Sequence, residues 1–358
     1  MKKASVFQML LITFLLSCQT ASFAQSHANI YDVVIDTDLG GDPDDIQSLY
    51  RMLHYTDILR IKGIISTPCN DSEEHPWDTI PQTQLILEWV KRVDLDHLRK
   101  NGYNELIREK DVVRLIYAGS PTPGLPSPER MSDGSQRLVL LAKRYSPGKP
   151  LWVLVWGSLT TVAQALYDDP AIAPNIRIYV IGSTNTEQDK LSRDFVHGFM
   201  VEKFNRLWWI ENGVLPKGSR ETFRGVYQGG EQTGEWNNIS FVEQNIRHHG
   251  STHQGLFHER CGDAFPGAIW PRGGLKEGDS PSLLYLLSPV IGNIGNVNDP
   301  TSDSWGGTFY RPEPAAYPNY YTDLDANPEA CQATISKWRV HFLSDWKARW
   351  DRYAVRKP

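Results

Sequence analysis

The sequence predicts an α/β fold in which a mostly parallel sheet is flanked by helices in a single domain. Short apolar, β-branched runs recur along the first half of the 358-residue chain, and segments with helical periodicity separate them. Strands that alternate with helices are typical of a parallel sheet that is covered on both faces. The chain is long enough for one large domain, and it shows no internal repeat and no low-complexity linker.

The first half of the chain supplies the elements of the sheet in βα order. Residues 32–36 form a short apolar run, and Ile46, Leu49 and Leu53 follow it at helical spacing. The remaining elements are expected as strands at 59–65, 151–155, 176–181 and 207–210 and as helices at 80–90 and 159–166.

The second half is less periodic. Residues 212–280 are rich in Gly, His, Arg and Trp, and we expect long loops around the rim of the sheet there. Near the end of the chain, one amphipathic helix is expected to carry an apolar stripe made of Ile335, Trp338, Phe342, Trp346 and Trp350. We assign this stripe to the core and not to a sugar-stacking surface.

Composition argues against a nucleic-acid-binding protein. Lys and Arg number 37 and Asp and Glu number 42, which gives a formal net charge of −5. A surface of this charge does not collect polyanions, so we expect no nucleic-acid partner. Hydrophobic residues make up 40% of the chain and charged residues 22%, which is typical of a globular protein and excludes a largely disordered one.

Residues 1–24 are expected to be an export signal, followed by one domain over 26–358. Lys2 and Lys3 precede an apolar run at 6–16 that is too short to span a membrane comfortably. Two processing sites remain open: residues 22–24 fit ordinary signal peptidase, whereas residues 15–18 resemble a lipoprotein box that would leave a lipid anchor on Cys18. We expect an exported protein, periplasmic or secreted, or else an outer-surface lipoprotein.

The strongest chemical signal is an acidic segment directly after the first strand. Five carboxylates lie within ten residues, at Asp36, Asp38, Asp42, Asp44 and Asp45. Parallel sheets gather ligands at the carboxyl ends of their strands, and crowded carboxylates repel one another unless a hard cation relieves the repulsion. The sequence therefore predicts a metal site, with a solvated acidic turn that caps a helix as the alternative.

Three known patterns compete for this segment. An EF-hand that starts at Asp36 would need Asp or Asn at position 40 and Glu at position 47, but Gly40 and Gln47 stand there. A DxDxT phosphatase would need Thr at position 40. The third pattern, a strand followed by DxDxGxDD, matches apart from two extra residues before the final Asp pair.

Further matches to this third pattern are spread along the chain. They lie in the segments 40–51 (GGDPDDIQSLYR), 63–70, 153–160, 277–281 and 305–307. With these segments the chain resembles the nucleoside hydrolase superfamily, and more closely its exported nucleoside-hydrolase-like branch, the DUF1593 group that occurs in a cellulose-binding protein. Members of that branch often continue into a β-rich C-terminal domain, which this sequence does not show.

The resemblance implies a Ca²⁺ site with an attached base. Asp38, Asp45 and Asp279 would hold the ion, and Trp156 would contribute its backbone carbonyl. Asp44 would bridge the ion and its water and act as the general base. For Asp279 an alternative stands beside this role, because an Asp ahead of Pro281 is also a common helix N-cap.

The resemblance also implies sugar contacts. Asn70 and Asn205 are candidates, and Asp42, which belongs to the two-residue insertion, could bind either the ion or the substrate. The leaving group departs with the help of a general acid or of an aromatic side chain that stacks on it. The sequence does not identify which residue plays this part. The candidate acids are His197, His248, His249, His253 and His258.

These features predict an exported, calcium-dependent hydrolase of a glycosidic bond, an O-glycoside or an N-riboside, that uses a calcium-held water and an Asp base. The expected partner is a small-molecule glycoside or an oligosaccharide, and an exported location favours a carbohydrate-derived O-glycoside. A non-catalytic carbohydrate-binding protein on the same fold is the main alternative, and a phosphatase is a third. The sequence leaves the oligomeric state open, including a homo-oligomer.

Overall fold

The computed structural model describes residues 31–40, 44–68, 81–200, 202–246 and 274–354. One eight-stranded sheet runs through this part of the chain in the order β3-β2-β1-β4-β5-β6-β8-β7. Neighbouring strands are parallel except β7 and β8, which pair antiparallel at one edge. The strands are β1 (Tyr31–Thr37), β2 (Leu59–Ser66), β3 (Ile116–Ala118), β4 (Leu151–Val155), β5 (Ile176–Ile181), β6 (Trp208–Asn212), β7 (Phe309–Tyr310) and β8 (Tyr320–Asp323).

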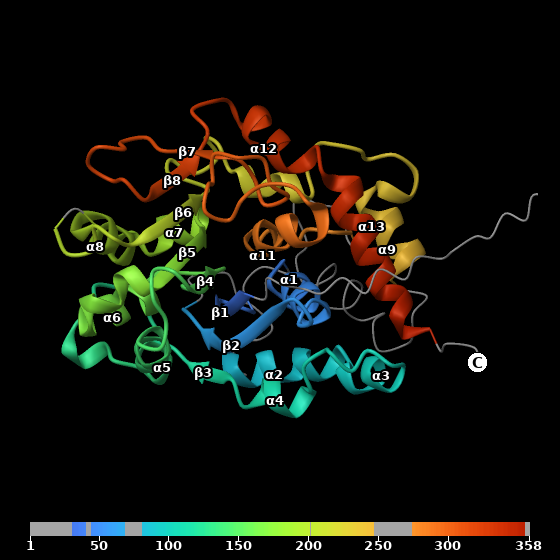
Figure 1. The fold of residues 1–358 in the computed structure, drawn as a ribbon, viewed down its shortest axis with the longest axis horizontal. Helices are drawn as coiled ribbons and strands as arrows, with labels where there is room; N and C mark the ends of the chain where they lie inside the picture. Colours follow the sequence, from blue (N-terminus) through green and yellow to red (C-terminus); the bar gives the residue numbers. More distant parts are fainter. Residues whose placement is uncertain (1–30, 41–43, 69–80, 201, 247–273, 355–358) are drawn as a thin grey trace, which may run out of the picture.

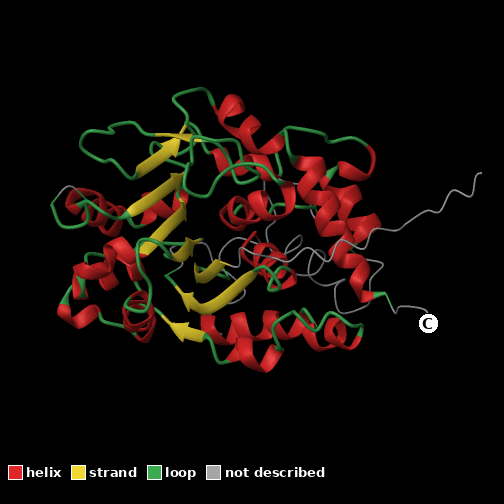
Figure 2. Cartoon of the chain, in the orientation of Figure 1, coloured by secondary structure: helices red, strands yellow, loops and turns green. Residues whose placement is uncertain are grey.

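Helices cover both faces of this sheet (Figure 1). They are α1 (Asp44–His54), α2 (Gln82–Arg92), α3 (Leu95–Lys100), α4 (Glu109–Val113), α5 (Asp133–Ala142), α6 (Thr160–Asp168), α7 (Thr184–Gln188), α8 (Lys190–Phe199), α9 (Asn238–Asn245), α11 (Ser280–Leu287), α12 (Pro328–Ser336) and α13 (Arg339–Trp350). α5, α6 and α8 pack on one face, and α1, α11 and α13 lie on the other. The predicted α/β class with a mostly parallel sheet is confirmed, and Figure 2 shows the helical layers on either side of the strands.

The central strands are buried on both faces. In β4, Trp152 and Leu154 point into the core that contains α1 and α13, whereas Val153 and Val155 point into the core beneath α5 and α6. All five residues of β4 are buried, as expected for a strand between two helical layers. A continuous apolar run such as LWVLV therefore indicates a strand in the interior of the sheet, covered by helices on both faces.

The register of the sheet brings the ends of β1 and β4 together. Asp36 pairs with Val155, so the chain leaves both strands at the same level of the sheet. Asp38, two residues after Asp36, and Trp156, one residue after Val155, consequently emerge at one shared carboxyl edge. β1 lies between β2 and β4, in the interior of the sheet.

Two sequence-based expectations need correction. The apolar stripe near the C-terminus belongs to two helices, because the chain turns between α12 and α13, but Ile335, Phe342, Trp346 and Trp350 are fully buried and the assignment to the core is confirmed. Residues 212–280 were expected to form loops, yet α9 lies within them. The part from 247 to 273 lies outside the described residues.

Within the described ranges, none of the helices combines the length and the apolar character that a membrane crossing requires.

Candidate metal centre

The acidic segment splits between the end of β1 and the start of α1. Asp38 follows β1 directly, and Asp44 and Asp45 occupy the first turn of α1. Acids in a first turn are stabilised by the partial positive charge of the helix N-terminus. The three side chains are nevertheless buried, with Asp38 and Asp44 each 8% exposed and Asp45 2% exposed. They point inward toward the edge of the sheet and do not form a solvated turn.

A loop from the far end of the sequence is fixed against α1. The Gln47 side-chain oxygen accepts hydrogen bonds from the backbone N–H groups of Lys276 and Glu277, at 2.8 and 3.1 Å. The Arg51 guanidinium pairs with the Glu277 carboxylate, with Nε 2.6 Å from Oε1. These contacts bring Asp279 to the start of α1.

Three acids meet at this junction. Asp44, Asp45 and Asp279 each offer an oxygen atom such that all three atoms lie within 4.8 Å of one another. Asp279 occupies the N-cap position of α11, but its side chain makes no capping hydrogen bond. Its Oδ2 atom is buried and has no hydrogen-bond partner in the described part of the chain. A cap does not explain this carboxylate, whereas a cation would.

The electrostatics of the group favour a bound cation. Burial raises the pKa of Asp45 and of Asp279 well above the usual range, and the neighbouring carboxylates raise both further. Burial also raises the pKa of Asp44 to about 7, against the effect of backbone N–H groups and the Arg224 charge, which lower it. Buried carboxylates repel one another when they are ionised, and a divalent ion bound between them removes this repulsion.

A buried lysine also enters the cluster. The Nζ atom of Lys276 lies 3.5 Å from Oδ2 of Asp44, and its side chain is only 4% exposed. Burial lowers the pKa of Lys276 well below its usual value, while the Asp279 and Asp38 charges act in the opposite direction. This one lysine does not balance the carboxylates of Asp44, Asp279 and Asp38 that act on it, so the cluster still has negative charge for a divalent ion to neutralise. Sequence reasoning missed Lys276, although it directly precedes the Glu-Gly-Asp segment.

The end of β4 completes this edge. A Cβ atom on Gly157 would lie 2.8 Å from Cβ of Asp38, so Asp38 packs directly against the backbone after Trp156. The Trp156 carbonyl accepts a hydrogen bond from Nδ2 of Asn185 at 2.6 Å. Because a carbonyl oxygen has two lone pairs, one remains for a metal ion. Asn185 follows β5 and had not been singled out from the sequence.

Of the other predicted contacts, Asn205 is the one within the described residues, and it does not lie at the acid cluster. Asn205 is exposed and precedes β6, so it lies at the amino edge of the sheet, opposite the acids, where its carbonyl accepts a hydrogen bond from Asn319 at 3.3 Å. Asn205 therefore lies away from the acid cluster. Asp42 and Asn70 lie outside the described residues.

Of the candidate leaving-group acids, His197 is the one within the described residues, and it does not lie at the acid cluster. His197 packs against the rings of Trp209, Tyr317 and Tyr320, at centroid distances of 6.2, 4.5 and 5.2 Å. It belongs to the packing of α8 on the sheet. The remaining candidates, His248, His249, His253 and His258, lie outside the described residues.

Arg224 is a second cation near the acids that the sequence analysis did not single out. It lies within residues 212–280, which were expected to form loops around the rim of the sheet. Arg224 lowers the pKa of Asp44, and its Nε atom pairs with Glu221 at 2.5 Å. The carboxylate of Asp323, at the end of β8, holds this stretch in place by accepting hydrogen bonds from the backbone N–H groups of Gly213 and Thr222, at 2.9 and 3.0 Å. These contacts join segments that are far apart in the sequence, so no helical or strand-like periodicity indicates them.

Comparisons with known proteins agree with the fold. The family model described as "Cellulose-binding Sde182, nucleoside hydrolase-like domain" matches residues 32–309, which include every acid of the cluster. A nucleoside hydrolase-related protein from Saccharophagus degradans, associated with carbohydrate metabolism, is similar in structure with a TM-score of 0.63 and 21% identity over 91% of this chain and 72% of that one. The plant nucleoside hydrolase PpNRh1 gives a TM-score of 0.51 and 12% identity over 87% of this chain and 98% of that one. No curated protein sequence matches the chain.

Proposed function

This chain belongs to the family of nucleoside hydrolase-like domains of the cellulose-binding Sde182 type, and from that premise we propose that it hydrolyses a glycosidic bond with the help of a divalent metal ion. The observation that carries the proposal is the meeting of Asp44, Asp45 and Asp279 with oxygen atoms within 4.8 Å of one another. The buried Oδ2 of Asp279, which has no hydrogen-bond partner among the described residues, supports a bound ion.

The ion in this proposal is Ca²⁺. Its ligands would be Asp45, Asp279 and Asp38, with the Trp156 carbonyl and a shared contact to Asp44. All of these donors are oxygen atoms, and carboxylates together with a backbone carbonyl are the ligand set that Ca²⁺ prefers. When bound, the ion would polarise a water molecule and orient vicinal sugar hydroxyls.

The side chain that performs the proton transfer is Asp44. In the metal-free protein burial raises its pKa to about 7, and a carboxylate within hydrogen-bond reach of the attacking water is the general base that this reaction needs. Asp44 would accept a proton from the attacking water while the anomeric bond breaks through an oxocarbenium-like state. A single base on one face of the sugar delivers water from that face only, so the product should have inverted anomeric configuration.

The substrate class in this proposal is a carbohydrate-derived O-glycoside, with an N-riboside as the alternative. Export favours the first, because residues 1–24 carry the pattern of a signal peptide and an exported enzyme has little access to nucleosides of the cytoplasm. The family description refers to cellulose binding, and the similar Saccharophagus protein is associated with carbohydrate metabolism.

A second candidate is a carbohydrate-binding protein that keeps the ion and lacks turnover. The buried Lys276 ammonium, 3.5 Å from Asp44 Oδ2, favours this candidate, because a cation beside the proposed base lowers its readiness to accept a proton. The two candidates share the metal site and differ only in whether water attacks.

The deciding experiment combines metal analysis of the purified protein with hydrolysis assays on nitrophenyl glycosides and nucleosides. We expect bound calcium and turnover of at least one glycoside. Asp44→Asn should lower turnover roughly a thousandfold with an unchanged circular-dichroism spectrum. Asp303→Asn is the matched control, because that carboxylate is 51% exposed and pairs with Lys337.

Each outcome has a separate meaning. Wild-type turnover by Asp44→Asn would remove Asp44 from the role of base. Bound calcium without hydrolysis of any compound would favour the binding protein.

A further inference from the structure

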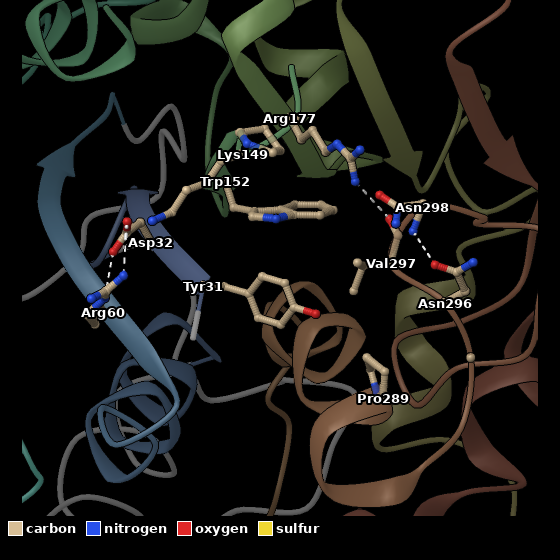
Figure 3. A pocket seen from close by; sticks show the side chains of 13 residues that line it. Tyr31, Asp32, Arg60, Lys149, Trp152, Arg177, Pro289, Asn296, Val297 and Asn298 are labelled. Carbon is tan, nitrogen blue, oxygen red and sulfur yellow. Dashed lines mark hydrogen bonds and ion pairs between the residues drawn. The ribbon is translucent and has the colours of Figure 1, made fainter. Parts of the chain in front are cut away.

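A polar cavity lies at the opposite edge of the sheet from the acids. Its volume is about 650 Å³, and it is lined at the start of β1 by Tyr31, at the start of β4 by Lys149 and Trp152, and on β5 by Arg177 (Figure 3). These residues begin their strands, whereas the acids follow the strand ends. A seven-residue strand spans roughly 23 Å, so the two sites are separated by about the length of the strands.

The lining of this cavity carries excess positive charge. It contains Arg60, Lys149 and Arg177, and the one carboxylate in the lining is that of Asp32. That carboxylate is already paired, with Arg60 at 2.8 Å and with Lys62 at 3.4 Å. An anion that entered the cavity would therefore meet Lys149 and Arg177, for which the described part of the chain provides no ion-pair partner.

Arg177 is the best placed of these cations. Its guanidinium lies against the rings of Trp152 and Trp208, at centroid distances of 5.4 and 5.1 Å, and donates one hydrogen bond to the Val297 carbonyl at 3.2 Å. Within the described ranges it forms no ion pair, although an arginine has five N–H donors. Burial lowers the pKa of Arg177, and the groups that oppose this effect are tyrosines. The group is held in place and half-buried in the lining of the cavity, where a ligand can reach it.

The remaining lining is suited to a sugar ring. The Tyr31 ring faces the cavity between the strand ends and the segment that carries Val297 (Figure 3), whereas the Trp152 indole, only 1% exposed, belongs to the buried wall behind it. The exposed amide side chains of Asn296 and Asn298 line the same space. Aromatic rings pack on the apolar face of a pyranose, and amides hydrogen-bond to its hydroxyls. Pockets of 300–1,000 Å³ are the usual size for small-molecule sites.

We propose that this cavity binds a sugar anion, that is, a monosaccharide unit that carries a carboxylate or a phosphate. The anionic group pairs with Arg177, with Lys149 adding long-range attraction, and the ring lies against Tyr31. The site is independent of the proposed hydrolysis, because it shares no residue with the acid cluster.

Calorimetric titration of the purified protein with glucuronate, glucose 6-phosphate, glucose and inorganic phosphate tests this proposal. We expect glucuronate or glucose 6-phosphate to bind, and the one that binds identifies the anionic group. Arg177→Gln should weaken that binding about tenfold or more, because it removes a charge-assisted hydrogen bond. Lys149→Gln, at an exposed position that does not endanger folding, should weaken it by a smaller factor.

The matched control is Lys143→Gln, which removes a charge paired with Asp169 outside the cavity lining and should leave binding unchanged. Binding should also persist in EDTA and in Asp279→Asn, which separates this site from the proposed metal site. The proposal is overturned if none of the sugar anions binds, if glucose or inorganic phosphate binds as tightly as they do, or if Lys149→Gln and Arg177→Gln both bind like the wild type.

Discussion

Arg51 and Glu277, which are 226 positions apart, form a two-pronged ion pair inside the protein. Arg51 Nε lies 2.6 Å from Oε1 of Glu277 and Nη2 lies 2.8 Å from Oε2, and the two side chains are 0% and 1% exposed. Arg51 belongs to α1, the helix that begins with Asp44 and Asp45, and Glu277 stands two residues before Asp279. The pair therefore sets the distance between the early and late acids.

Removal of one partner of this pair should be costly. Arg51→Met leaves the Glu277 carboxylate buried without a counter-charge, which should lower the free energy of unfolding by about 3–5 kcal/mol. Adding Glu277→Leu in the same protein should recover part of this loss, because the buried charge is gone. Urea unfolding of the single and double variants measures both effects. Arg220→Met, which breaks a pair with the 75%-exposed Asp325, should cost less than about 1 kcal/mol; equal losses in the two single variants would contradict the role given to Arg51.

Gly278 should be needed for the position of Asp44. A Cβ atom at Gly278 would lie 2.1 Å from Oδ2 of Asp44, so Gly278→Ala must displace the carboxylate or the loop. We expect calcium affinity and turnover to fall about tenfold or more, with a stability loss of about 1–3 kcal/mol. Calorimetry with calcium and urea unfolding measure the two effects. Gly198→Ala is the control, because nothing lies within 4 Å of the added atom; calcium binding that is the same in both variants would show that Asp44 does not hold the ion.

The central part of the fold could be predicted from the sequence because its signal is local. Buried parallel strands such as β4 and β5 are continuous apolar runs, and a strand of this kind needs no knowledge of its partners to be identified. β3, β7 and β8 were missed because they contain three, two and four residues. Strands this short at the side of a sheet are formed by pairing with their neighbours, and their own residues give no periodicity.

The residues of the candidate site also fall into two groups, those that the sequence indicates and those that only the fold brings together. Asp38, Asp44 and Asp45 could be singled out because they lie close together in the sequence, and Asp279 through a family resemblance. Lys276 and Asn185 could not, because each becomes part of the site only when distant segments pack together. A lone lysine or asparagine in a loop carries no signal of the neighbours it will have in the fold.

The Lys276 ammonium should compete with a metal ion. It lies 3.5 Å from Oδ2 of Asp44, so its charge repels a divalent ion held by the same carboxylates. Lys276→Met keeps a similar volume and removes the charge, and it should raise calcium affinity about tenfold, measured by calorimetry. Lys347→Met is the control, since that lysine pairs with Glu235 away from the acids. A lower affinity in Lys276→Met would mean that the ammonium holds the carboxylates in place for the ion.

The stability of the metal-free protein should fall as the pH rises through the range in which the acids ionise. The pKa of Asp44 is raised to about 7 in the folded protein, and those of Asp45 and Asp279 are raised as well, whereas an unfolded Asp titrates near 3.9. Between these values the folded state binds more protons than the unfolded state, so the free energy of unfolding decreases from about pH 4 to about pH 7.

Calcium should reverse this dependence, because it binds the ionised carboxylates and its stabilising effect grows over the same range. Thermal unfolding in EDTA should therefore give a lower Tm at pH 8 than at pH 5, with the largest gain on calcium addition at pH 8. Other groups also titrate in this interval, so the difference between the wild type and Asp279→Asn isolates the cluster. The variant should show a flatter profile in EDTA and a smaller calcium gain; identical profiles for the two proteins would mean that the acids neither repel one another in the folded state nor hold the ion.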